Sequence, residues 1–444
     1  MLKPLLLSCT LAFSLSASTI KDFTLHKKGL GENNNTLLVI GGIQGDEPGG
    51  FNAASLLVTH YKITKGNLWV VPNLNFMSIL KRSRGPYGDM NRKFADLSLN
   101  DPEYGIVKKI QKIIRHNEVN LILNLHDGSG FYNKQYIDPL HNPHKWGQSC
   151  IIDQATIGHA KYGALKNMAD KAQTHINQHL ITKLHHFGVK NTKTSEGDAE
   201  MAKSLTYYAM QQQKPAFGIE GSKSLPTHER VYYHLLALES FMHQMGIEYK
   251  RDFSLTPKGV WRAINHDIDV TLYNTIHLPL KNARTQLRYF PMPKDKEPDL
   301  ASSTPIVGLL KNRDLYRVAY GNRRVTNLIP QYFTFDYSLE SINIKADGEI
   351  KEVKIGSVLE VNRDFKVEIL PKEYRVNLIG YAKKGLKNEA GVFVKKDEFL
   401  KQFSIDKSGT TFRVELYKKE KFSGMVLVRF VPPQIPSARL ASLK

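Results

Sequence analysis

Cysteine is scarce in this chain. The 444 residues include two, Cys9 and Cys150, so no disulfide framework supports the fold. Long apolar runs are missing too, because the one candidate, residues 5–15, is too short to span a bilayer stably. The sequence also lacks a repeat of fixed period and a low-complexity tract. With 41% hydrophobic and 23% charged residues, the composition predicts a soluble, globular protein of two or three domains.

Acidic residues are in deficit. The chain has 42 Asp and Glu against 62 Lys and Arg, which gives a formal charge of +20. Such a balance favours polyanionic or carboxylate-rich partners: nucleic acid, anionic lipid, or an acidic polymer outside the cytoplasm. The charge by itself does not choose among these partners.

The first residues indicate export. Lys3 precedes the apolar stretch, and small residues follow at 16–18, as in a secretory signal peptide over 1–18. Export would remove Cys9 and leave Cys150 alone, and it weakens the nucleic-acid interpretation. Under a second interpretation Cys9 is a lipoprotein cysteine, but only a few apolar residues would then precede the cleavage site.

Apolar runs alternate with helical patterns up to about residue 250, which predicts an α/β domain. The expected strands cover residues 37–40, 68–71, 121–125 and 216–219. The expected helices cover residues 51–61, 103–116, 157–185 and 229–246. Helices between consecutive strands favour a sheet that is largely parallel or mixed. The Pro- and Gly-containing region 130–189 is expected to supply loops over the edge of the sheet.

Short alternating runs after residue 250 predict an all-β region. We expect a boundary near 250 and a second one within 338–345. The predicted organisation is therefore a signal peptide over 1–18, a catalytic α/β domain over 19–250, a small β domain over 251–340, and a β-sandwich-like domain over 341–444.

Polar residues cluster at the ends of the expected strands. Each of the four clusters lies in or just after one strand: Gln44 and Glu47; Arg82, Arg84, Asp89, Asn91 and Arg92; His126 and Asp127; and Glu220. Strand ends of a parallel or mixed sheet can meet at one crevice. Gln, Glu and His side chains brought together there could hold one divalent ion with a fourth position open for water, as a catalytic zinc site requires.

These clusters carry a resemblance to a known family. The sequence resembles the zinc metallocarboxypeptidases of the carboxypeptidase A type, whose motifs are His-x-x-Glu, an arginine, Asn-Arg, a distant His and a final Glu. Here Gln44 and Glu47 occupy the first motif, followed by Arg84, Asn91-Arg92, His126 and Glu220 in the same order. The departure is Gln44, where most members have histidine. With the signal peptide and the β modules, this Gln variant is similar to cell-shape-determining D,L-carboxypeptidases of helical Gram-negative bacteria.

The resemblance implies a role for each residue. Gln44, Glu47 and His126 would bind one Zn²⁺, Glu220 would be the general base, and Arg84 would stabilise the oxyanion. Asn91 and Arg92 would bind the terminal carboxylate of the substrate. The family also has a tyrosine lining the site, for which Tyr207 and Tyr208 both remain candidates.

Because an amide oxygen is a poorer zinc donor than imidazole, Gln44 should depend on a supporting partner. By analogy with the family, Asp89 is that partner. We expect it to accept a hydrogen bond from the amide of Gln44, whose oxygen would face the metal.

The resemblance further implies a periplasmic enzyme acting on peptidoglycan stem peptides, releasing meso-diaminopimelate from the γ-D-glutamyl residue of a tripeptide. Other envelope cell-shape proteins are expected partners, and the mature chain is expected to lack a transmembrane helix.

Two alternatives remain open. One is a related zinc deacylase or amidase acting on another carboxylate substrate. The other is a non-catalytic peptidoglycan-binding scaffold, against which Glu220 and Arg84 argue. Cys150 is expected to be an inert, packed thiol.

Overall fold

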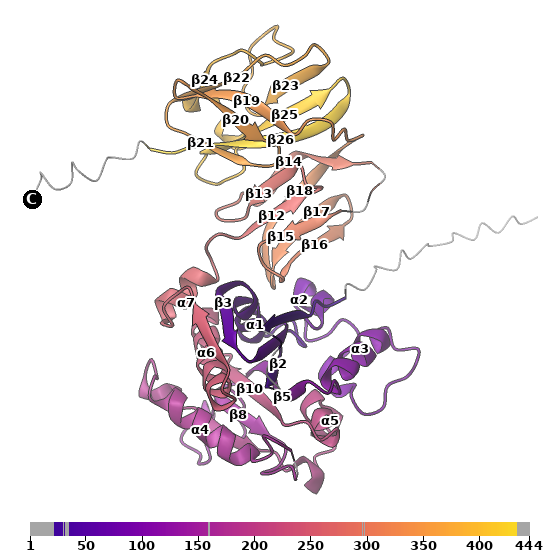
Figure 1. The fold of residues 1–444 in the computed structure, drawn as a ribbon, viewed down its shortest axis with the longest axis vertical. Coiled ribbons are helices and arrows are strands. Elements are labelled where there is room, and N and C mark those ends of the chain that lie inside the picture. The colour runs from indigo at the N-terminus through magenta and orange to yellow at the C-terminus, as the bar shows by residue number, and fades with distance from the viewer. Residues whose placement is uncertain are drawn as a thin grey trace, which may run out of the picture.

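The computed structural model describes residues 22–29, 31, 35–158, 160–294, 296 and 298–432. The signal peptide expected over 1–18, with Cys9, lies outside these residues. Figure 1 shows an α/β domain that carries two β units stacked end to end. Within the described part of the chain, no helix combines the length and the apolar character needed to cross a membrane.

The α/β domain is built on one mixed sheet. Its seven strands follow the order β1 (His26–Gly29), β4 (Asn67–Val71), β2 (Thr36–Ile40), β5 (Val119–Gly128), β10 (Ala216–Ser222), β8 (Ser149–Ile152) and β9 (Gly188–Asn191). Strands β4, β2, β5 and β10 run parallel, whereas β1 and β8 run antiparallel to β4 and β10. The predicted α/β fold is confirmed, and all four predicted strands lie in this sheet. A separate ribbon pairs β3 (Tyr61–Lys65) with β11 (Glu248–Arg251).

Helices cover both faces of the sheet because successive residues of a strand point to opposite sides. In β2, Leu37 and Val39 pack into one core, and Leu38 and Ile40 pack into the other. The first core contains α1 (Pro48–His60), α4 (Leu165–Asn177), α6 (Thr227–Gln244) and α7 (Pro257–Ala263). The second core contains α3 (Tyr104–Ile114) and α5 (Leu205–Gln211).

The helix predicted over 157–185 is wrong in length, because α4 occupies only its middle part. Before α4, the backbone N–H of Ile157 donates to the carbonyl of Gly163 at 2.8 Å and closes a loop. A side chain on Gly163 would come within 2.1 Å of the Ile157 oxygen, so the loop requires glycine there. After α4, the Asn177 side chain exchanges two hydrogen bonds with the backbone of Phe187, at 2.9 and 3.0 Å, and the chain turns back towards β9.

The β units follow α7. The first contains a three-stranded sheet of β13 (Ile276–Pro279), β12 (Asp269–Leu272) and β15 (Leu300–Ser302), and a four-stranded sheet of β14 (Gln286–Pro293), β18 (Arg323–Phe333), β17 (Leu315–Tyr320) and β16 (Val307–Asn312). The second packs β20 (Glu349–Lys354), β19 (Ser341–Ala346), β22 (Asp364–Val367) and β24 (Val394–Lys395) on β21 (Val358–Val361), β26 (Lys421–Phe430), β25 (Thr411–Lys418) and β23 (Tyr374–Leu378). One apolar core lies between these last two sheets, which makes the unit a β-sandwich.

The first β unit is fixed to its neighbour on each side. Phe51 of α1, with Phe76 and Leu80 of α2 (Phe76–Lys81), joins the apolar core of this unit. The Ser55 and Thr304 hydroxyls lie 2.7 Å apart across the same junction. On the other side, residues of β25 and β26 enter the same core. The apolar contacts are therefore continuous from the catalytic domain to the sandwich.

Candidate active site

The polar clusters predicted from the sequence meet at one edge of the central sheet, because β2, β5 and β10 run parallel and end there. Glu220 of β10 pairs in register with His126 of β5. Together they line a cavity of about 320 Å³. All seven predicted site residues line it: Gln44, Glu47, Arg84, Asn91, Arg92, His126 and Glu220. Arg82, which lies in the same sequence cluster, instead ends α2 in a left-handed backbone conformation with φ of 60°.

Three potential ligand atoms converge at the top of this cavity. His126 Nδ1 lies 3.1 Å from Gln44 Oε1 and 3.0 Å from Glu47 Oε2. A tetrahedral metal about 2.1 Å from each ligand would set such atoms roughly 3.4 Å apart. One oxygen from an amide, one from a carboxylate and one imidazole nitrogen therefore fit a divalent metal with little movement.

The environment of His126 supports the same assignment. Burial would lower the pKa of this imidazole, but its hydrogen bond with Glu47 and the nearby charges of Glu220 and Asp89 raise it. The ring therefore lies in a field that favours positive charge.

Asn124 contacts the other ring nitrogen of His126, with its Nδ2 2.8 Å away, while its buried Oδ1 has no partner. The two ends of an amide are assigned from the hydrogen-bond network. Turning this amide over lets Oδ1 accept from His126 Nε2–H and leaves Nδ1 free to bind metal. No sequence motif singles out Asn124, although it lies two residues before His126 and faces the same side of β5.

The hydrogen bond predicted between Gln44 and Asp89 is present. Gln44 Nε2 donates to Asp89 Oδ1 at 2.7 Å, which turns Gln44 Oε1 towards His126. Asp89 Oδ1 also accepts from the backbone N–H of Asn91 at 2.9 Å, and Oδ2 accepts from Arg84 Nε at 2.9 Å. Burial would raise the pKa of Asp89, but the hydrogen bond from Gln44 and the charge of Arg84 lower it. Asp89 therefore stays ionised and holds the amide in one orientation.

Glu47 is held by cations on its outer oxygen. Its Oε1 lies 3.4 Å from Arg84 Nη1 and 3.2 Å from Lys223 Nζ, while Oε2 accepts from the backbone N–H of Asp127 at 3.1 Å. The Lys223 ammonium also lies 3.2 Å from Asp46 Oδ2. Two cations on Oε1 leave Oε2 to face the ligand cluster. Lys223 was not predicted, although it follows Glu220 by three residues.

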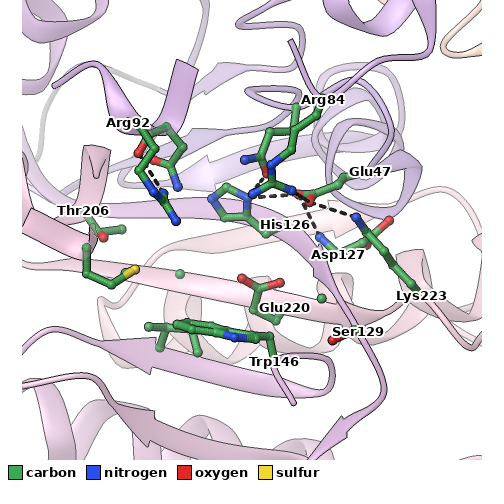
Figure 2. Close-up of a pocket in the computed structure, with 16 residues that line it drawn as sticks. Glu47, Arg84, Arg92, His126, Asp127, Ser129, Trp146, Thr206, Glu220 and Lys223 are labelled. Atoms are coloured by element: carbon green, nitrogen blue, oxygen red, sulfur yellow. Dashed lines mark hydrogen bonds and ion pairs between the residues drawn. The ribbon is translucent and has the colours of Figure 1, made fainter. Parts of the chain in front are cut away.

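Glu220 has no hydrogen-bond or ion-pair partner among the described residues. In Figure 2 its carboxylate lies between the His126 ring and the indole of Trp146. Burial, together with the negative charges of Glu47 and Asp127, raises the pKa of this carboxyl. Trp146 comes from region 130–189, which was predicted to supply loops over the sheet edge. An unpaired carboxylate with a raised pKa is suited to accepting and returning a proton.

Arg92 lies on the opposite side of the cavity from Lys223 (Figure 2). Its Nη1 donates to the Asn91 carbonyl at 3.0 Å, and its Nε lies 3.3 Å from Glu200. The Asn91 Oδ1 accepts from the backbone N–H of Leu205 at 3.0 Å, which leaves Asn91 Nδ2 with no partner in the described chain. These donors can receive an anionic group of a ligand.

Thr206, rather than either candidate tyrosine, lines the cavity. The Tyr208 ring packs near Phe94, with ring centroids 6.1 Å apart, and Tyr207 packs against the core on the helix α6 side of the sheet. Because α5 is short and begins at Leu205, only its first turn reaches the cavity.

The side chain of Asp127 has a structural role, whereas its backbone N–H holds Glu47 in the ligand cluster. The Asp127 carboxylate accepts from Gly49 N–H at 2.8 Å and lies 3.1 Å from Arg230 and 3.2 Å from His234. It therefore ties the start of α1 to α6, behind the ligand cluster. Strand β8, which pairs with β10 on the side away from β5, buries Cys150. Burial raises the pKa of its thiol, as expected of an inert packed thiol.

Family models match almost the whole chain. The catalytic model described as a carboxypeptidase controlling helical cell shape matches residues 6–265. The β-barrel domain of the same carboxypeptidases matches residues 265–334, and the C-terminal domain of metallo-carboxypeptidases matches residues 335–431.

Solved structures of the cell shape determinant Csd4 from Helicobacter pylori are similar along their full length. The apo form is 41% identical with a TM-score of 0.87, covering 92% of this chain and 100% of its own. The tripeptide-bound form has the same identity, TM-score and coverage. The mDAP-bound form, described as a D,L-carboxypeptidase, is 42% identical with a TM-score of 0.87, covering 91% and 100%. No curated protein sequence matches this chain.

Proposed function

We propose, from the premise that this chain belongs to the family of carboxypeptidases that control helical cell shape, that it is a zinc D,L-carboxypeptidase of the periplasm. Its substrate would be the uncrosslinked peptidoglycan tripeptide stem, from which it releases meso-diaminopimelate and leaves a dipeptide. Membership makes the chain a metallocarboxypeptidase; zinc and the scissile bond are the proposal. The observation that carries it is the convergence of Gln44, Glu47 and His126 opposite the unpaired Glu220.

Gln44 Oε1, Glu47 Oε2 and His126 Nδ1 would hold the zinc ion. When bound, zinc supplies a Lewis acid that lowers the pKa of a water and polarises the scissile carbonyl. Asp89 keeps the oxygen of Gln44 turned towards the ion, and Asn124 keeps a lone pair of His126 available.

Arg92 and Asn91 would bind the terminal carboxylate of the tripeptide. Arg92 offers guanidinium donors in a fork, and Asn91 Nδ2 has no other partner among the described residues. Such binding selects the last residue of a stem peptide, because an internal residue has no free carboxylate. Glu200 holds the outer edge of Arg92, so the guanidinium is oriented before the substrate enters.

Glu220 would take a proton from the attacking water and return it to the leaving amine of diaminopimelate. Its raised pKa brings it closer to neutrality than an exposed carboxyl, which favours both transfers. Arg84 is fixed by Asp89 through Nε and lines the cavity, so its terminal N–H groups can stabilise the oxyanion.

The proposed location and partners are inferred from the sequence and from the relatives. The expected signal peptide supports export, and the charge of +20 suits an anionic wall polymer. The Helicobacter pylori relative has been solved with a tripeptide and with mDAP, which supports the same substrate class here. Other envelope cell-shape proteins are proposed partners of the β units.

The test uses purified chain 19–444 with its metal content measured. A defined muramyl tripeptide is incubated beside tetra- and pentapeptides, and the products are followed by mass spectrometry. We expect loss of diaminopimelate from the tripeptide alone, abolished by chelator and by Glu220→Gln. Bound zinc without tripeptide turnover would favour a deacylase or amidase acting on another carboxylate substrate. If the purified chain contained no zinc and cleaved none of the peptides, a peptidoglycan-binding scaffold would be favoured.

A further inference from the structure

A second cavity, of about 260 Å³, lies where the three parts of the chain meet. Asn265 lines it from the segment after α7, Lys281 and the start of β18 line it from the first β unit, and Lys407 lines it from the sandwich. Four lining residues are cationic and none is acidic: Lys281, Arg323, Arg324 and Lys407. We call this the junction pocket.

Arg323 is held in this pocket by neutral groups. Its guanidinium donates to Asn265 Oδ1 at 2.6 Å and to the Ile264 carbonyl at 2.9 Å, and lies 4.5 Å from the centre of the Tyr320 ring. Burial lowers the pKa of Arg323. The contacts fix the side chain in place without neutralising its charge.

The other cations of the junction pocket also lack an anion. Lys281 Nζ lies 3.1 Å from His266 Nδ1, and neither Arg324 nor Lys407 forms an ion pair with a described residue. Beside them, Arg317 has a buried Nε with no partner, and burial and the charge of Arg324 lower its pKa. In the active site, by contrast, Arg84, Arg92 and Lys223 all face carboxylates.

We propose that the junction pocket binds carboxylate groups of the peptidoglycan that carries the substrate, and so serves as a second attachment point for the polymer. Guanidinium forks and ammonium groups around a cavity of this size recognise small oxyanions, and carboxylates are the oxyanions that stem peptides present. This inference rests on the proposed function for the identity of the polymer. The pocket itself is independent of the active site in its residues.

The start of β18 connects the junction pocket to the metal-binding loop. Asn322, beside Arg323, donates from Nδ2 to the carbonyl of Gly45 at 3.3 Å. Gly321 adopts φ of +53° and lies so close to Phe51 that a side chain on it would come within 2.6 Å of that ring. A polymer held by Arg323 and Arg324 is therefore attached directly after the turn that contacts the loop carrying Gln44 and Glu47.

The test compares two double variants of the full chain in a Glu220→Gln background, which prevents turnover. Arg324→Ala/Lys407→Ala removes two charges from the junction pocket. Lys351→Ala/Lys354→Ala removes two charges from exposed positions on β20. Binding to purified sacculi is measured by co-sedimentation over a range of salt concentrations. We expect about tenfold weaker binding and a shallower salt dependence for the pocket variant alone. Equal binding by the two variants would overturn the proposal.

The anion is identified by treating the sacculi. Amidation of the sacculus carboxylates should remove the difference in binding between the two variants. Inorganic phosphate, compared with chloride at the same ionic strength, should compete only weakly with the sacculi for the junction pocket. A difference that survives amidation, or that phosphate alone abolishes, would contradict a carboxylate site.

Soluble tripeptide separates this inference from the proposed reaction. With Glu220 restored, the pocket variant should cleave it at the wild-type rate, since a single stem does not need a second attachment point. A slowed rate would show that the junction pocket acts on the active site and would overturn its role as a polymer anchor. If wild-type protein fails to cleave the tripeptide but the pocket variant still loses sacculus binding, the anchor stands and the proposed reaction fails.

Discussion

An arginine in the active site and an arginine between the two β units both pair with carboxylate groups, but the two regions use the pairing differently. In the active site, Arg84 contacts Asp89 and Glu47 while the ligand atoms and the Glu220 carboxylate still face a cavity. Between the two β units, Arg413 lies 3.0 Å from Glu415 and donates to the carbonyls of Arg288 and Tyr289, with both charged side chains 3% exposed. Charge pairing alone therefore does not mark a functional site. A functional site is marked instead by potential metal-ligand atoms and a carboxylate that still face a cavity.

The largest effect is expected at the unpaired carboxylate. Glu220→Gln keeps the shape of the side chain but cannot accept a proton, so kcat/KM for the tripeptide should fall by about 10²- to 10⁴-fold. Metal content should remain that of the wild type, and the free energy of unfolding should not fall, because the variant removes a buried carboxylate with no partner among the described residues. The matched control is Glu118→Gln on the surface, which should leave turnover unchanged. Turnover that survives Glu220→Gln would assign the general base elsewhere.

The second effect concerns stability at the β-unit junction. Arg413→Ala leaves the Glu415 carboxylate buried without its cation, which should cost about 3–5 kcal/mol of unfolding free energy. Arg429, whose Nη1 lies 3.6 Å from the exposed Glu360, offers the matched control, and Arg429→Ala should cost no more than about 1 kcal/mol. Chemical denaturation followed by fluorescence measures both. Equal losses would mean that burial does not distinguish the two pairs.

The same junction should respond to pH. Burial raises the pKa of Glu415 above its ordinary 4.5, so the folded protein keeps this proton to a higher pH than the unfolded chain does. The contribution of this group to stability is therefore full below about 4.5 and is lost as pH rises through the folded pKa. Arg413→Ala removes a cation that lowers this pKa, so its stability loss should grow from acid to neutral pH. A loss independent of pH would show that Glu415 is not the group involved.

A smaller effect is expected at the support of Gln44. Asp89→Ala removes the acceptor that orients the amide, so zinc affinity should fall about 10- to 100-fold in chelator competition. Asp96→Ala, at an exposed position nearby in the chain, is the control and should bind zinc normally. Wild-type affinity in Asp89→Ala would mean that Gln44 does not depend on this hydrogen bond.

The smallest effect concerns the second cation on Glu47. Lys223→Met removes one of the two positive charges near Oε1, but the ammonium is partly exposed and Arg84 remains. Zinc affinity should change by no more than about fivefold, in keeping with a solvent-screened ion pair. A loss as large as that of Asp89→Ala would place Lys223 among the residues that the metal site requires.

The sequence predicted which strand ends form the site better than it predicted the other residues that line the cavity. Gln44, His126 and Glu220 follow or end apolar runs, and parallel strands bring such ends together whatever their spacing in the chain. Trp146 and Lys223 escaped prediction because their place depends on the path of loops, which no periodicity records. The overlong helix over 157–185 has the same origin, since the loop closed at Gly163 depends on a close backbone contact between residues six apart.

Anomalous diffraction from a crystal of the zinc-loaded chain tests the central claim most directly. We predict one zinc ion about 2.0–2.2 Å from Gln44 Oε1, Glu47 Oε2 and His126 Nδ1, with Glu220 facing its open position. Zinc bound through His126 Nε2, or bound without Gln44, would contradict the account.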